Sequence, residues 1–266
     1  MKQCLKTALI LAVMGCTFGL PAQMASAEQP ENFEQYFQQL QKLANYKAPR
    51  AGVASISSGF GASDGQTYIA ISYTDRDTQT NGADDDGSIA IGYGFGDPVN
   101  SVGLELTTAI TSVSTGLWGD GNFGDEGNLS VKIHKRTSPI FGSAASAALG
   151  ASNLTGWGGT REVPTNYSVS YSEINIFGTY NEYASNFTIG YGTGIAGVER
   201  DPGAFLGVGL GSGDFSGSLA YNGDEFNAGL TYYIPRITGG SLGVMIGDLD
   251  NAQGRNRIVI TLAKSW

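Results

Sequence analysis

The chain has little of what catalytic and metal sites are usually built from. Its 266 residues include one histidine, His134, and two cysteines, Cys4 and Cys16. A thiol catalyst, a disulfide framework or a zinc site with several histidines therefore cannot form in the body of the chain. Basic residues are also scarce: 15 lysines and arginines face 24 acidic residues, for a formal net charge of −9. We therefore expect no metal, no cofactor and no nucleic-acid partner.

Long hydrophobic runs are missing beyond the N-terminus, so no later segment offers the roughly 20 apolar residues of a spanning helix. Residues 1–27 form a signal-peptide pattern: lysines, an apolar stretch that Pro21 ends, and a small-x-small site from Ala25 to Ala27. We expect cleavage after this site and export of the chain. The alternatives are an N-terminal membrane helix, which Pro21 disfavours, and lipid attachment at Cys16.

Residues 28–50 are rich in glutamate and glutamine and poor in glycine. Their apolar positions recur every three or four residues, which predicts one face of a helix. These positions are Phe33, Tyr36, Phe37, Leu40, Leu43 and Ala44. We expect a short amphipathic helix against one mouth of the β-barrel predicted for residues 51–266, or a tail. The alternatives are a plug in the lumen of that barrel and a periplasmic contact.

From residue 51 onward the hydrophobic period changes to two, which predicts strands. One face of each segment is apolar, whereas the other carries Gly, Ser, Thr and charges, as in a barrel with a polar lumen. The clearest segments are 66–76, 87–96, 101–112, 128–136, 186–194, 204–211 and 257–266. Further strands are expected near 51–60, 139–150, 165–176, 215–223, 225–234 and 240–249.

The fold class predicted from this pattern is all-β. We expect residues 51–266 to form a single antiparallel up-and-down transmembrane β-barrel of about 12 strands, with 10–14 as the range. Short turns should alternate with longer loops. The 40 glycines, 13 tyrosines and 12 phenylalanines suit tight turns and aromatic girdles.

The last strand adds a resemblance to a known class of protein. It places Ile258, Ile260, Leu262 and Trp266 on one face and ends the chain on the tryptophan. In this it resembles Gram-negative outer-membrane barrels, which commonly finish on an aromatic residue that the assembly machinery reads. The resemblance implies a bacterial outer-membrane location, with the lipid bilayer, lipopolysaccharide and the assembly machinery as partners. Lys264 departs from the pattern, since a hydrophobic residue is usual there.

Three stretches are similar to hairpins of uncharacterised, cyanobacterial-type outer-membrane proteins. They are Gly92 to Pro98, Val102 to Glu105, and Leu129 to Arg136. This narrower resemblance implies a barrel and no known activity.

The candidate site is a charged cluster on the inward face. Alternation points Glu105 inward from one strand, and Lys132, His134 and Arg136 inward from the next. Buried charges need partners or water. The cluster could line a constriction that selects small solutes, or form an ion-pair network that stiffens the interior.

Glycines on the inward face leave a second question open. They include Gly190, Gly192, Gly207, Gly209 and Gly211. They could widen a lumen, let strands bend strongly, or let the N-terminal helix pack closely.

The leading functional hypothesis is a porin-like passive channel for small solutes, and we expect no enzyme. A structural or adaptor barrel without an open pore is the alternative. Less favoured are a barrel-embedded hydrolase that uses His134 with Ser130, and a secreted soluble β-protein.

Overall fold

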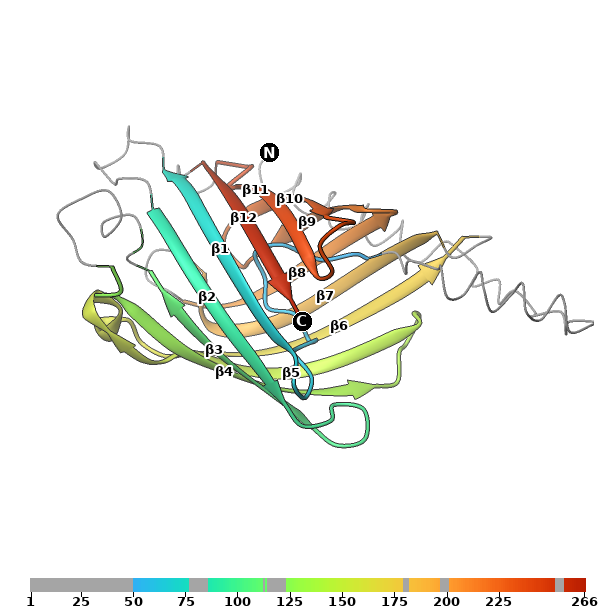
Figure 1. Ribbon diagram of the computed structural model, residues 1–266, viewed down its shortest axis with the longest axis horizontal. Helices are drawn as coiled ribbons and strands as arrows, with labels where there is room; N and C mark the ends of the chain where they lie inside the picture. Colours follow the sequence, from blue (N-terminus) through green and yellow to red (C-terminus); the bar gives the residue numbers. More distant parts are fainter. Residues whose placement is uncertain are drawn as a thin grey trace, which may run out of the picture.

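The computed structural model describes residues 50–76, 86–111, 113, 123–178, 182–196, 201–251 and 256–266. These residues form a closed barrel of twelve antiparallel strands, in which each strand pairs with its sequence neighbours and β12 pairs with β1 (Figure 1). The predicted fold class is therefore confirmed. The predicted signal peptide 1–27 and residues 28–49 of the predicted helix lie outside the described residues.

The strands follow the chain in an unbroken meander. They are β1 (Thr67–Arg76), β2 (Asp86–Phe95), β3 (Gly103–Ile110), β4 (Gly127–Thr137), β5 (Ala144–Trp157), β6 (Asn166–Phe177), β7 (Tyr183–Ala196), β8 (Asp201–Ser212), β9 (Phe215–Tyr221), β10 (Phe226–Tyr233), β11 (Gly240–Gly247) and β12 (Arg257–Ser265), with a short 3₁₀ helix η1 (Gly158–Glu162) after β5. Among the described residues, no helix is long and apolar enough to cross a bilayer.

The barrel has two different ends. The end at which the chain terminates carries short connections, such as 213–214 between β8 and β9, and we call it the short-turn rim. The opposite end, where β12 begins, carries the longer connections 77–85 and 111–126 and is called the loop rim. Short turns on one side and longer loops on the other are typical of outer-membrane barrels.

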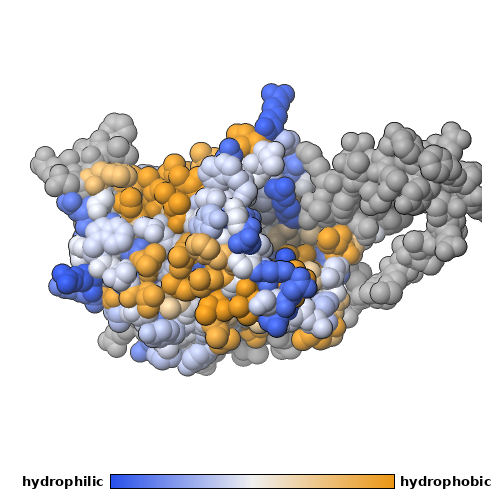
Figure 2. Space-filling model, turned by 60° about the horizontal axis from the view of Figure 1, so that its bottom comes forward, coloured by the Kyte–Doolittle hydropathy of each residue, from blue (hydrophilic) through white to orange (hydrophobic). Residues whose placement is uncertain are grey.

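The outer surface of the wall is apolar. Alternate residues along each strand expose large hydrophobic side chains, for example Ile91 at 51% and Leu149 at 61%. Figure 2 shows such apolar patches spread over one outer face. The opposite alternate residues face inward and are small or polar, such as Ser146 and Ser172, which are fully buried. An apolar exterior with a polar interior is the distribution of a transmembrane barrel, since the outer face contacts lipid.

Aromatic residues gather at the ends of the outer belt. At the short-turn rim they form contacts between adjacent strands: the rings of Phe177 and Tyr183 lie 5.6 Å apart, and those of Phe215 and Tyr232 lie 4.9 Å apart. Aromatic girdles mark the interfaces between hydrocarbon and water in such barrels. The aromatic contacts at the short-turn rim therefore agree with strands that cross a bilayer and end at its interface with water.

Candidate functional site

Residues 50–66, which we call the lumenal segment, run inside the barrel before the chain enters β1. Figure 1 shows this stretch in blue within the ring of strands. The prediction of a strand near 51–60 is wrong, because these residues are not part of the barrel sheet. Gly52, Gly59 and Gly61 disfavour a regular strand. Side chains of the barrel wall form hydrogen bonds with N–H and C=O groups of the lumenal segment, in place of the backbone partners that a neighbouring strand would provide.

The first part of the lumenal segment lies against β7 to β10. The side-chain amide of Asn186 donates to the carbonyl of Ala51 at 3.3 Å, and the N–H of Ala54 donates to the hydroxyl of Ser218 at 3.3 Å. The later part crosses to β6, where the N–H of Gly59 donates to the hydroxyl of Ser172 at 2.8 Å. Further along, the N–H of Ala62 donates to Glu105 of β3, so the segment bridges opposite sides of the wall.

Inward-facing glycines are the places where this backbone meets the wall. A Cβ atom at Gly209 would lie 2.2 Å from the carbonyl oxygen of Gly52, and one at Gly211 would lie 1.8 Å from that of Arg50. Gly94 is equally close to the other end of the segment. The sequence left open that inward glycines admit the predicted N-terminal helix, most of which lies outside the described residues; at these positions they admit a different, non-helical stretch. This stretch is the lumenal segment.

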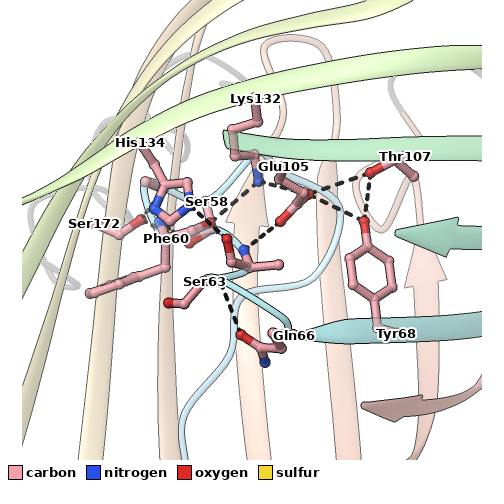
Figure 3. Close-up of polar contacts among 12 residues, drawn as sticks. Ser58, Phe60, Ser63, Gln66, Tyr68, Glu105, Thr107, Lys132, His134 and Ser172 are labelled. Atoms are coloured by element: carbon pink, nitrogen blue, oxygen red, sulfur yellow. Dashed lines mark hydrogen bonds and ion pairs between the residues drawn. The ribbon is translucent and has the colours of Figure 1, made fainter. Parts of the chain in front are cut away.

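Glu105 is the centre of the inward charged cluster. It is 8% exposed, and its carboxylate accepts the N–H of Ala62 at 2.7 Å and the phenol of Tyr68 at 3.2 Å. The phenol also lies 2.7 Å from the hydroxyl of Thr107. The ammonium of Lys132 lies 3.9 Å from the same carboxylate. This buried acid therefore has partners from the wall and from the lumenal segment (Figure 3).

Two inward-facing basic side chains of β4, Lys132 and Arg136, converge on Phe60 of the lumenal segment. Lys132 donates to the carbonyl of Phe60 at 3.3 Å, and the guanidinium carbon of Arg136 lies 4.5 Å from the centroid of its ring. A cation over an aromatic face is attracted by the ring quadrupole. Both charges therefore help to hold the segment in the lumen.

His134 is enclosed by the lumenal segment and β3. It is 3% exposed, and its Nε2 atom lies 3.0 Å from the carbonyl oxygen of Ala62. A Cβ atom at Gly61 or Gly103 would lie within 2.6 Å of the ring. The hydroxyl of Ser130 instead donates to Asn128 and accepts the N–H of Asn153. The described contacts therefore do not include the Ser130–His134 pair on which a hydrolase would depend.

The structure thus brings all four residues of the predicted cluster together on the inward face. Glu105, Lys132, His134 and Arg136 all contact residues 60–62 of the lumenal segment. Alternation in the sequence located these side chains, but it gave no sign of their shared partner. Whether they line a path for solutes stays a prediction.

A cavity of about 330 Å³ lies in the lumen on the loop-rim side of the lumenal segment. Eight of the fifteen described residues that line it are polar and uncharged, two are the ionisable residues Glu105 and Lys132, and the others are apolar or glycine. The lining residues are Ser55, Ile56, Ser57, Glu105, Thr107, Ser130, Val131, Lys132, Gly150, Ala151, Ser152, Asn166, Ser168, Phe205 and Asn222. The cavity can hold a small polar molecule.

A second polar group near the loop rim was missed by the sequence analysis. Arg257 forms a bidentate ion pair with the buried carboxylate of Glu225. Beside it, the side-chain carbonyl of Asn227 accepts the N–H of Asp248, and both residues are buried. The alternation of β12 did carry a signal, since it places Arg257 on the face opposite Ile258. In the described part of the chain, no group of three or more His, Cys, Asp or Glu side chains is placed to hold a metal ion.

The residues of the predicted assembly signal lie on the outer face of β12. Ile258, Ile260, Leu262 and Trp266 are between 42% and 63% exposed. The ammonium of Lys264 lies 5.0 Å from the centroid of the Trp266 ring. Their role in assembly stays a prediction.

No protein-family model and no curated protein sequence matches the chain. Among solved structures, it is similar to a "KdgM porin" at 13% identity and TM-score 0.46, covering 75% of this chain and 99% of that one. It is also similar to outer membrane phospholipase A from Escherichia coli, at 11% identity and TM-score 0.47, covering 75% and 92%. A third is an outer membrane channel from Pseudomonas putida F1, at 10% identity and TM-score 0.45, covering 77% and 97%.

At these identities the likeness concerns architecture and says nothing of activity. The narrower resemblance to cyanobacterial-type proteins stays a prediction. The chain itself folds as a closed barrel of twelve antiparallel strands, apolar outside and polar inside, which is the architecture of outer-membrane β-barrels.

Proposed function

We propose that this protein is a porin-like passive channel for small solutes in a bacterial outer membrane, with the lumenal segment at its narrowest point. The observation that carries the proposal is the polar cavity of about 330 Å³ inside the barrel, bounded on one side by residues 55–57. Glu105 and Lys132 belong to both the cavity lining and the contacts of the segment. The charged cluster and the segment together would form the constriction.

The same proposal names the surroundings of the barrel. Residues 1–27 would direct export, and the outer belt would contact the lipid bilayer. Lipopolysaccharide would surround the loop rim. The outer-membrane assembly machinery would read Ile258, Ile260, Leu262 and Trp266. The barrel would carry out no chemical step.

A structural barrel without an open pore is the second candidate, and the anchoring of the lumenal segment favours it. Four side chains of the wall fix this backbone in the lumen: Asn186 and Lys132 donate hydrogen bonds to it, and Ser172 and Glu105 accept hydrogen bonds from it. A segment that never moves could close the passage and stiffen the wall.

A reversible crosslink separates the two candidates. The hydroxyl oxygens of Ser58 and Ser172 lie 3.3 Å apart, so cysteines at both positions can form a disulfide after a small approach of the two sulfur atoms. We expect the reduced Ser58→Cys/Ser172→Cys barrel to conduct in planar bilayers, and the oxidised form to lose most of that conductance because the segment can no longer shift. The single variants Ser58→Cys and Ser172→Cys are the matched controls.

Two results would count against the channel. If the wild type and the reduced double variant both leave the bilayer at its background conductance, the barrel is non-conducting and the structural reading is correct. If oxidised and reduced forms conduct equally, solutes pass a stationary segment, and the segment has no gating role.

A further inference from the structure

Ser55 has an unusual backbone at the part of the lumenal segment that borders the cavity. Its φ is +68°, in the left-handed region that residues with a Cβ atom rarely adopt. Glycine takes this conformation without strain. A strained residue that persists at a cavity suggests that its side chain has a use there.

Ser55 is one of five serines that line the cavity. Ser57 joins it from the lumenal segment, and Ser168 joins it from β6. The contacts of the described residues give none of these three hydroxyls a hydrogen-bond partner within the protein. Each can therefore donate one hydrogen bond to a bound molecule and accept others.

The charged groups of the cavity are already compensated. The carboxylate of Glu105 binds the N–H of Ala62 and lies beside Lys132, whose ammonium also donates to the carbonyl of Phe60. A charged solute would bring a further charge without a counterpart, and burying such a charge is costly. A neutral solute with several hydroxyl groups would exchange hydrogen bonds with the serines and leave this ion pair intact.

We propose that the cavity binds a neutral polyhydroxylated solute, a polyol or a small saccharide, through the hydroxyls of Ser55, Ser57 and Ser168. The volume of about 330 Å³ lies at the lower end of the range for small-molecule sites. This inference adds a substrate class to the proposed function. It rests on that function in one respect, that solutes can enter the lumen.

Binding can be measured without any transport. Saturation-transfer NMR on the full barrel in dodecylphosphocholine micelles avoids detergents with sugar headgroups. Glucose is the neutral probe, while glucosamine and glucuronate are its charged counterparts with the same ring. We expect signals from glucose, and binding of both charged compounds that is at least about threefold weaker, because each brings a charge without a counterpart into the cavity.

Ser55→Gly is the decisive variant because it removes the hydroxyl and relieves the backbone strain at once. We expect a higher melting temperature together with about threefold to tenfold weaker binding of glucose, the effect of one lost neutral hydrogen bond. Ser168→Ala should weaken binding to a similar extent. Ser241→Ala, on the inward face of β11 and outside the cavity lining, is the matched control and should leave binding unchanged.

The possible results separate this inference from the proposed function. Glucose binding in a barrel that does not conduct would refute the channel and support the site. Conductance without glucose binding would refute the site alone. Unchanged binding in both Ser55→Gly and Ser168→Ala, or equal binding of glucose and its charged counterparts, would also overturn it.

Discussion

The two halves of the lumenal segment are held in different ways. Residues 50–54 lie on glycines and make two hydrogen bonds of 3.3 Å to neutral side chains, with the Arg50 guanidinium 5.1 Å from the centroid of the Tyr233 ring. Residues 58–64 are bound by a buried carboxylate, a buried histidine and a lysine, at 2.7, 3.0 and 3.3 Å. Hydrogen bonds to charged groups are the stronger class.

The difference indicates which half can move. Residues 58–64 are tied to the end of β2 through Asp64 and the adjoining Gly65, whose N–H groups donate to the carbonyls of Gly96 and Gly94. Residues 50–54 have no comparable connection in the described contacts. Weakly held elements open first. We therefore expect the first half to leave the wall first when the lumen opens, and the second half, from Ser58 onward, to follow only after it.

The largest expected effect comes from Glu105→Ala, which removes the central anchor of the second half. The N–H of Ala62 would lose its acceptor and Lys132 its counter-ion. We expect a loss of about 3 kcal/mol in the free energy of unfolding, at the low end for a broken buried pair because Lys132 keeps some contact with water. Denaturant titration in micelles measures this loss, and hydrogen exchange should accelerate over residues 58–64.

Glu162→Ala is the matched control, because Glu162 lies exposed in η1 and should change stability by less than about 0.5 kcal/mol. If Glu105→Ala unfolds like the control, or if its hydrogen exchange accelerates only over residues 50–54, Glu105 is not the anchor of the second half.

The sequence predicted the wall much better than its contents. Contact with lipid requires every second residue of each strand to be apolar. The two-residue period of the sequence therefore predicted both the barrel and the inward direction of Glu105 and Lys132. The partner of Glu105 could not, because Ala62 is 43 positions away and binds through its backbone, which leaves no trace in residue type. The strand predicted near 51–60 is wrong, and the spacing of its apolar residues already disagreed with a strand. Val53 and Ile56 are three residues apart, whereas residues on one face of a strand are two apart, and both approach Gly207.

Gly61→Ala has the next largest expected effect, since its Cβ atom would lie 2.6 Å from the ring of His134. We expect a loss of about 1–2 kcal/mol from overpacking. In a double-mutant cycle with His134→Ala the two losses should be less than additive, because removal of the ring makes room for the new methyl group. Strict additivity of the two free energies would show that the ring does not hold this part of the segment.

The double variant Gly209→Ala/Gly211→Ala should cause the smallest change in stability. It is also the most direct test of how differently residues 50–54 and residues 58–64 are held. The new methyl groups would meet the carbonyls of Gly52 and Arg50 and push the first half of the segment off the wall. Because that half is weakly held, we expect a loss of no more than about 1 kcal/mol, below the usual cost of overpacking a core.

Single-channel conductance should rise in this double variant if the first half of the segment narrows the lumen. Gly243→Ala is the matched control, since Gly243 also sits in the barrel wall but its Cβ atom would have no neighbour closer than 3.9 Å. Equal conductance in the double variant, the control and the wild type would place the constriction in residues 58–64. A loss of stability as large as that of Glu105→Ala would instead show that both halves of the segment are parts of one fixed plug.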